Sequence, residues 1–244
     1  MVSFGTAIKR PFQDLKTAII GIILGIIPVV NILTVPGFAL RNAKKSLEGD
    51  DSLLSWEDWR DIIVKSIILL VITFIYTLPV TVLVLALFGS VIFSLIGTIS
   101  STQAGYAMLF PLVTTAAPDS AVMSQISATV NTMLGAVLIL AVLALFIAFI
   151  LPMAVMHWLK EENISAAFRL GSVIKRSFTG PYVIAWIFTI IIAIVFAIIA
   201  AILGLIPTVG AFIGSGIALY VNSVAQYTLF AQAYRELEQR VATA

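Results

Sequence analysis

The sequence has no cysteine and very few charged residues. Without cysteine, the chain forms no disulfide, no thiolate metal site and no cysteine nucleophile. Charged residues make up 11% of the chain, whereas apolar residues make up 61%. A soluble domain of this length cannot bury so much apolar surface, so we expect a multi-pass protein of the cell membrane.

Histidine is almost missing as well, since His157 is the single one. A lone histidine without a second histidine or a cysteine makes a poor metal site. His157 lies beside Trp158 at a predicted membrane boundary, where an interfacial polar anchor is favoured over a catalytic role.

The apolar stretches contain no acidic or basic residues away from their ends. Because pumps and ion-coupled carriers place ionisable groups there, active transport is disfavoured. The sequence shows no paired carboxylates, no nucleophile with an adjacent base and no metal-ligand spacing. We therefore expect no enzyme activity and no cofactor, and no nucleic acid among the partners.

Four stretches exceed the roughly 20 residues that a bilayer-spanning helix requires. They are residues 62–87, 131–158, 181–206 and 209–233. Lysine and arginine cluster before the first, between the second and third and after the fourth, and none occurs at 81–158. The positive-inside rule then places both termini in the cytoplasm and residues 100–130 outside.

The stretch 62–100 would be about 58 Å long as one helix, more than a bilayer needs. We expect one span here, kinked by Pro79 and ended at Gly89, followed by an uncharged external region.

Lys9, Arg10 and Lys16 precede an apolar run as in a signal peptide, but no small-x-small cleavage site follows. We expect this N-terminal segment to be retained.

The apolar run 17–40 has basic residues on both sides, which a full crossing would place on opposite sides of the membrane. A helix from Thr17 to Pro28 would reach only about 16 Å. Several residues break or bend helices in this run: Gly21, Gly25, Pro28, Asn31, Pro36 and Gly37. We expect a re-entrant hairpin with its apex at Pro28–Asn31.

A second copy of this arrangement occurs later in the chain. Residues 5–12 resemble 171–178, and the apex at 23–31 resembles 202–210, which includes Pro207 and Gly210. The second hairpin is longer by 13 residues, about 20 Å of helix, so it is expected to cross fully. The predicted fold is all-α and polytopic, with two unequal hairpin repeats, four full spans, one re-entrant hairpin and two cytoplasmic amphipathic helices.

We expect this to be a single membrane domain over 1–244 with three parts. Residues 1–61 hold a basic interfacial helix, the re-entrant hairpin and an acidic segment with tryptophans. Residues 62–162 hold two spans, and 163–244 hold the second basic helix and the full hairpin. The basic helices carry apolar residues at helical spacing and are expected to place four cations on lipid headgroups: Lys9, Arg10, Lys175 and Arg176. The alternative is a connector that simply obeys the topology rule.

The acidic stretch 48–61 holds half of the carboxylates of the chain. Its spacing fits no calcium loop, so a helix cap formed by Ser55 with Asp58 is favoured over a metal site. Three tryptophans at predicted boundaries suit the membrane interface: Trp56, Trp59 and Trp158.

Small and polar residues mark the helix faces. Gly21-x-x-x-Gly25 and Gly210-x-x-x-Gly214 allow close helix approach, within one chain or between copies. Asn222 and Gln226 either hydrogen-bond to neighbouring helices or line a polar pocket, and packing is the favoured interpretation.

The order of these elements resembles a known family. The features are a basic helix, an apolar hairpin ending in Ile-Pro-x-Val-Asn at 27–31, and Leu-Ser-Trp-Glu-Asp-Trp at 54–59 before a proline-containing span. They are similar to the domain-of-unknown-function family numbered 4013, prokaryotic and largely archaeal integral membrane proteins. The resemblance is clearest over 4–84 and returns from 168 onward. It implies membrane class and topology, and no catalytic or ligand residue transfers.

Two functional hypotheses follow. The first is a non-enzymatic, oligomeric protein that organises or senses the bilayer, with membrane lipids, anionic lipids among them, and further copies of itself as partners. The second is a passive channel or facilitator for a small or lipid-like solute, suggested by the apex at 28–31 and the polar strip near Asn222.

Overall fold

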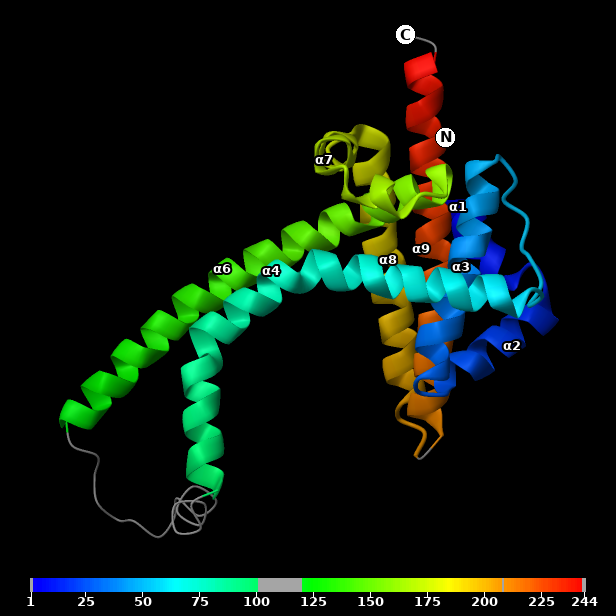
Figure 1. The fold of residues 1–244 in the computed structure, drawn as a ribbon. Helices are drawn as coiled ribbons and strands as arrows, with labels where there is room; N and C mark the ends of the chain where they lie inside the picture. The colour runs from blue at the N-terminus through cyan, green and yellow to red at the C-terminus, as the bar shows by residue number, and fades with distance from the viewer. Residues whose placement is uncertain (1, 101–119, 208, 243–244) are drawn as a thin grey trace. The chain divides into compact units, whose positions relative to one another are not determined.

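The computed structural model describes residues 2–100, 120–207 and 209–242, and within them the chain is helical with no strand (Figure 1). The all-α class is therefore confirmed for the described residues. Most of the predicted external region, at 101–119, lies outside them. The elements are α1 (Phe4–Lys9), η1 (Arg10–Phe12), α2 (Leu15–Ile26), α3 (Val30–Leu47), α4 (Trp59–Ser100), α6 (Ser120–Glu161), η3 (Ile164–Phe168), α7 (Leu170–Ser177), α8 (Gly180–Leu203) and α9 (Gly210–Ala242).

The chain forms two compact units. One combines Met1–Ile75 with Phe149–Ala244, and the other is Tyr76–Ala148. The second unit holds the later part of α4 and the earlier part of α6, and its large apolar side chains are exposed, Leu138 by 66% and Val142 by 69%. Such a surface suits lipid, whose tails are as apolar as leucine. The single domain expected from the sequence stays a prediction.

Helix α9 is the centre of the first unit, with α8, α3 and α2 packed against it (Figure 1). Most of its side chains between Tyr220 and Tyr234 are buried. Three other helical segments are long and apolar enough to cross a membrane: Trp59–Gly89, Leu134–Glu161 and Gly180–Leu203. The chain therefore has the character of a membrane protein, while a fourth crossing by α9 stays a prediction.

Helices α2 and α3 form the first hairpin, joined by a turn at residues 27–29. Asp14 caps α2 by accepting a hydrogen bond from the Thr17 amide at 2.8 Å. At the turn, Val29 has a φ of 68°, and Asn31 Nδ2 donates to the Gly25 carbonyl at 3.2 Å. The turn thus overlaps the apex predicted from the sequence, and whether this hairpin is re-entrant stays a prediction.

Pro36 and Gly37, expected to break or bend a helix, do not break this one, because α3 runs through both. The Gly37 amide donates to Ser66 Oγ at 2.8 Å. A Cβ at Gly37 would lie 1.9 Å from the Ile62 carbonyl oxygen, so glycine lets α3 pass directly against the start of α4. Gly89 likewise lies inside α4, which continues to Ser100. In an apolar solvent the helix satisfies its own backbone, so a glycine need not end it.

The acidic segment after α3 is an irregular loop that leads to α4. The predicted cap at Ser55 is replaced by one at Asp58, because α4 begins at Trp59. Asp58 accepts from the Asp61 amide at 3.3 Å through its carboxylate and from the Ile62 amide at 3.2 Å through its carbonyl. The loop is held down by Trp56, whose buried indole donates to the Thr17 carbonyl at 2.9 Å.

Candidate functional site

The contacts of other elements with helix α9 show at which level along the axis of α9 each of them lies. Arg10 bonds to Thr228 of α9, and Arg176 lies over the ring of Tyr234. These α9 residues are six positions apart, about 9 Å along a helix. The two cation-bearing segments, η1 and α7, therefore meet α9 at similar levels in its C-terminal half.

The two hairpin turns meet α9 at its other end. Gly25 near the first turn faces Gly216, and the second turn leads directly into Gly210. Counted from Thr228, Gly216 lies about 18 Å and Gly210 about 27 Å along the helix. The second distance is close to the roughly 30 Å of a bilayer hydrocarbon core, and the first is clearly shorter.

Two of the four predicted headgroup cations are exposed beside exposed apolar side chains. Lys9 ends α1 and is followed by Phe12, which is 50% exposed, and by Leu15, which is 72% exposed. Lys175 lies on α7, whose ends carry Leu170 and Phe178, 51% and 63% exposed. Both segments present a cation and apolar surface together, as an interfacial helix does.

Arg10 differs from Lys9 and Lys175 in that its side chain is fully buried. Its guanidinium donates to Thr228 Oγ1 and to the carbonyls of Asn42 and Ser52, each at 2.9 Å, and to the hydroxyl of Ser46. Desolvation lowers the pKa of Arg10 to about 10, opposed by the charges of the nearby aspartates at 50 and 51. A buried cation with these partners does not fit the headgroup contact expected from the sequence.

Arg176 is half-buried, with its guanidinium carbon 4.7 Å from the centroid of the Tyr234 ring. Its Nη1 has no hydrogen-bond partner among the described residues. The Tyr234 hydroxyl lies 3.4 Å from Nδ1 of His157, which is only 2% exposed. His157 is therefore inside the helix packing, and the expected interfacial anchor does not describe its position.

The family described as "Protein of unknown function (DUF4013)" matches residues 20–205, more than half of the chain. The chain belongs to this family. Among curated proteins and solved structures, none matches the chain. The match covers the first hairpin turn and ends at residue 205, before Pro207 of the second. The family resemblance inferred from the sequence is confirmed.

The family has no assigned function, so it gives no role to the glycines predicted at the helix faces. The glycines pack inside the chain. A Cβ at Gly21 would lie 2.3 Å from the Tyr220 ring, and one at Gly25 would lie 3.0 Å from the Gly216 carbonyl oxygen. A Cβ at Gly214 would lie 2.9 Å from the backbone of Ala200. These close approaches join α2 to α9 and α8 to α9 within one molecule.

Two polar residues of α9 predicted from the sequence, Asn222 and Gln226, are half-buried. Asn222 and Gln226 both lie in the packed part of the helix, and Oδ1 of Asn222 is buried without a hydrogen-bond partner among the described residues. Such an oxygen costs about 1–3 kcal/mol unless water or a ligand reaches it. Within residues 2–100, 120–207 and 209–242, no group of three or more His, Cys, Asp or Glu side chains is placed to hold a metal.

The three predicted interfacial tryptophans divide into two kinds. Trp59 is 44% exposed at the start of α4, where an interfacial anchor fits. Trp56 and Trp158 are only 8% and 5% exposed. Trp56 stacks on Phe38 with ring centroids 4.0 Å apart, so it fixes the loop to α3 rather than facing headgroups.

Proposed function

We propose that this chain is a non-enzymatic, multi-pass membrane protein that organises or senses the bilayer through its two basic amphipathic segments, α1–η1 and α7. The observation that carries the proposal is the exposure of Lys9 and Lys175 beside exposed apolar side chains. A cation near an anionic membrane surface contributes about 1 kcal/mol, and the apolar neighbours add their burial in the interface. Arg10 has no part in this contact.

The proposed topology has four crossings, by α4, α6, α8 and α9, with both termini in the cytoplasm. Support comes from the levels along α9, where the basic segments meet its C-terminal half and both hairpin turns lie toward its N-terminal end. The first hairpin, shorter by about 9 Å along α9, is proposed to be re-entrant. This arrangement also leaves the positive charges on one side of the membrane.

The absence of native cysteine makes the topology directly testable. Single cysteines replace Lys175, Leu205 and Val29, of which Leu205 is 81% and Val29 67% exposed. With an impermeant maleimide on intact cells, we expect labelling of the Leu205→Cys variant, weak labelling at Val29, and labelling at Lys175 only after permeabilisation. Labelling at Leu205 that also requires permeabilisation would contradict the crossing of the second hairpin.

The lipid contact is tested with a variant that carries Lys9→Gln and Lys175→Gln. In nanodiscs of mixed anionic and neutral lipid, we expect this variant to lose enrichment of anionic lipid at its surface by roughly tenfold at low salt. The matched control removes two other exposed cations, Lys160→Gln and Arg240→Gln, which lie outside both segments. Equal enrichment in all three proteins would overturn the proposal.

Homo-oligomer formation stays a prediction with no surface assigned to it. The glycine faces that suggested it are occupied by helix packing within one chain. Native mass spectrometry of the solubilised protein measures the particle mass directly, and a monomer at all concentrations would remove this part of the proposal.

A second candidate function, a passive facilitator, is favoured by the unpartnered Asn222 oxygen inside the bundle. If a polar path passes this residue, protein-containing liposomes should leak small polar solutes, and Asn222→Leu should close the path. Liposomes that remain tight at high protein density would exclude it.

A further inference from the structure

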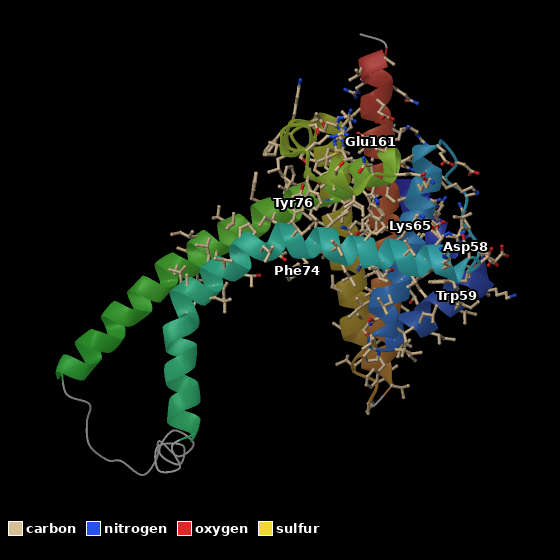
Figure 2. All side chains as sticks on the ribbon, in the orientation of Figure 1. Asp58, Trp59, Lys65, Phe74, Tyr76 and Glu161 are labelled. Carbon is tan, nitrogen blue, oxygen red and sulfur yellow. The ribbon has the colours of Figure 1, made fainter. Side chains whose placement is uncertain are left out.

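A cleft of about 540 Å³ lies between α3, the start of α4 and the residue that follows α6. Seven charged side chains form most of its wall. Four are cations, Arg41, Lys44, Lys45 and Lys65, and three are carboxylates, Glu48, Asp61 and Glu162. We call this the cationic cleft. Figure 2 labels Lys65 on α4 and Glu161 at the end of α6, the two span ends beside it. All of it lies within the first compact unit.

Helical spacing explains why the charges converge. Arg41, Lys44 and Lys45 stand at positions i, i+3 and i+4 of α3, which share one helix face. Asp61 and Lys65 stand at i and i+4 of α4. The cleft therefore forms where two charged helix faces meet.

Among the side chains that line the cationic cleft, the four cations outnumber the three carboxylates by one, which favours an anion. Arg41 pairs with Asp61 at 3.1 Å and with Asp58 at 3.9 Å, and Lys45 pairs with Asp50 at 3.1 Å. Lys65 pairs with Asp61, which it shares with Arg41. Lys44 pairs with Glu162, whose side chain is 66% exposed, and an exposed pair of this kind is weak. A phosphate could take the place of Glu162 on Lys44, because lysine and arginine bind phosphate oxygens through strong, charge-assisted hydrogen bonds.

The neighbouring part of the cleft is apolar. A second cavity of about 240 Å³ shares four charged residues with the first, Lys44, Asp61, Lys65 and Glu162, and its other lining side chains are apolar. These are Val64, Ile68, Trp158 and Leu159. Val64 and Ile68 stand at positions i and i+4 of α4, on one helix face, and Ile68 lies about one turn beyond Lys65 in a segment apolar enough to span a membrane. A ligand on the lysines would thus have a charged end and an apolar end.

We propose that the cationic cleft binds one membrane phospholipid, with its phosphate on Lys44 and Lys65 and the first carbons of its chain against Val64 and Ile68. The position supports this occupant over a soluble phosphate ester. The cleft lies at the ends of two candidate spans, α4 and α6, and headgroups lie at that level of a bilayer. This site is separate from α1–η1 and α7 and does not depend on them.

The test is native mass spectrometry of the delipidated full chain in mild detergent, with phosphatidylglycerol added and diacylglycerol as the phosphate-free probe. We expect one retained phosphatidylglycerol, a loss of at least tenfold in the Lys44→Gln/Lys65→Gln variant, and no retained diacylglycerol. The control Lys9→Gln/Lys175→Gln should retain lipid like the wild type. Because that control removes the cations of the proposed interfacial segments, the two proposals fail independently.

Two results with the double variant and the wild type would overturn the inference, and a third with Glu162→Gln would do so as well. One is equal retention of phosphatidylglycerol by the wild type and the Lys44→Gln/Lys65→Gln variant. The other is displacement of the lipid by millimolar glycerol phosphate, which would show a site for a free phosphate ester. If the double variant does not fold, Glu162→Gln answers the question, since freeing Lys44 should raise retention several-fold. Unchanged or lower retention in a folded Glu162→Gln protein contradicts the site.

Discussion

Nη1 of Arg10 donates a hydrogen bond to Oγ1 of Thr228 over 2.9 Å, across 218 positions of the sequence. The Thr228 hydroxyl in turn donates to the Val224 carbonyl at 2.7 Å, which leaves its oxygen free to accept from the guanidinium. Nη2 holds the carbonyls of Asn42 and Ser52. One buried cation therefore ties η1, α3, the acidic loop and α9 together.

Replacing Arg10 by glutamine should lower the free energy of unfolding by about 3 kcal/mol or more, because several buried acceptors lose their donor. Thermal unfolding in a mild detergent, followed by circular dichroism, measures the change. The control is Lys9→Gln at the exposed neighbour, where a shift within about 0.5 kcal/mol is expected. If the two variants unfold alike, the buried cation does not hold these elements together.

Gly21→Ala should destabilise the first unit, because its Cβ would lie 2.3 Å from the fully buried ring of Tyr220. Overpacking of this kind costs about 1–3 kcal/mol. Gly171→Ala on α7 is the matched control, since no atom lies within 4 Å of its added Cβ and alanine favours a helix. Unfolding midpoints that fall for both variants, or for neither, would contradict the close approach of α2 to α9.

Acid should weaken the loop after α3 through Asp50. The Ser52 amide, which donates at 2.8 Å, and then Lys45 lower the pKa of Asp50 from 3.8 to about 2. Since the folded-state pKa lies below the unfolded value, this carboxylate contributes stability above about pH 4, and the contribution is lost as the pH falls from 3.8 to about 2. Asp50→Asn should show a shallower loss of stability over that interval in thermal unfolding. An identical loss in both proteins would count against the contact.

The parts of the fold that depend on local sequence could be predicted. Apolar length gives the helical membrane class, and the Pro28 and Pro207 regions give the two hairpin turns, because proline and glycine act on the backbone where they stand. The same local rule misplaced a break at Pro36. There, Gly37 serves a close approach to Ile62, which no local pattern reveals.

The candidate sites were less predictable because their partners are distant in sequence. Arg10 has sequence neighbours similar to those of Arg176, yet the hydrogen-bond acceptors of Arg10 lie 32 to 218 positions away. Trp56 sits before a span and resembles an interfacial anchor until its stack on Phe38 is seen. For the cationic cleft, the sequence offers the i, i+3, i+4 spacing of Arg41, Lys44 and Lys45, which places three cations on one face of α3.

Glu162 has a φ of 53°, a left-handed conformation that costs a residue with a Cβ about 1–2 kcal/mol. Glycine adopts it freely, so Glu162→Gly should remove this strain while losing only an exposed ion pair with Lys44, worth at most about 1 kcal/mol. We therefore expect the unfolding midpoint of Glu162→Gly to match or exceed that of the wild type. Glu161→Gly, one residue earlier inside α6, is the control and should destabilise by about 1 kcal/mol. If Glu162→Gly is the less stable of the two, the ion pair contributes far more than its exposure allows, and the ready exchange of Glu162 for a phosphate would lose its physical basis.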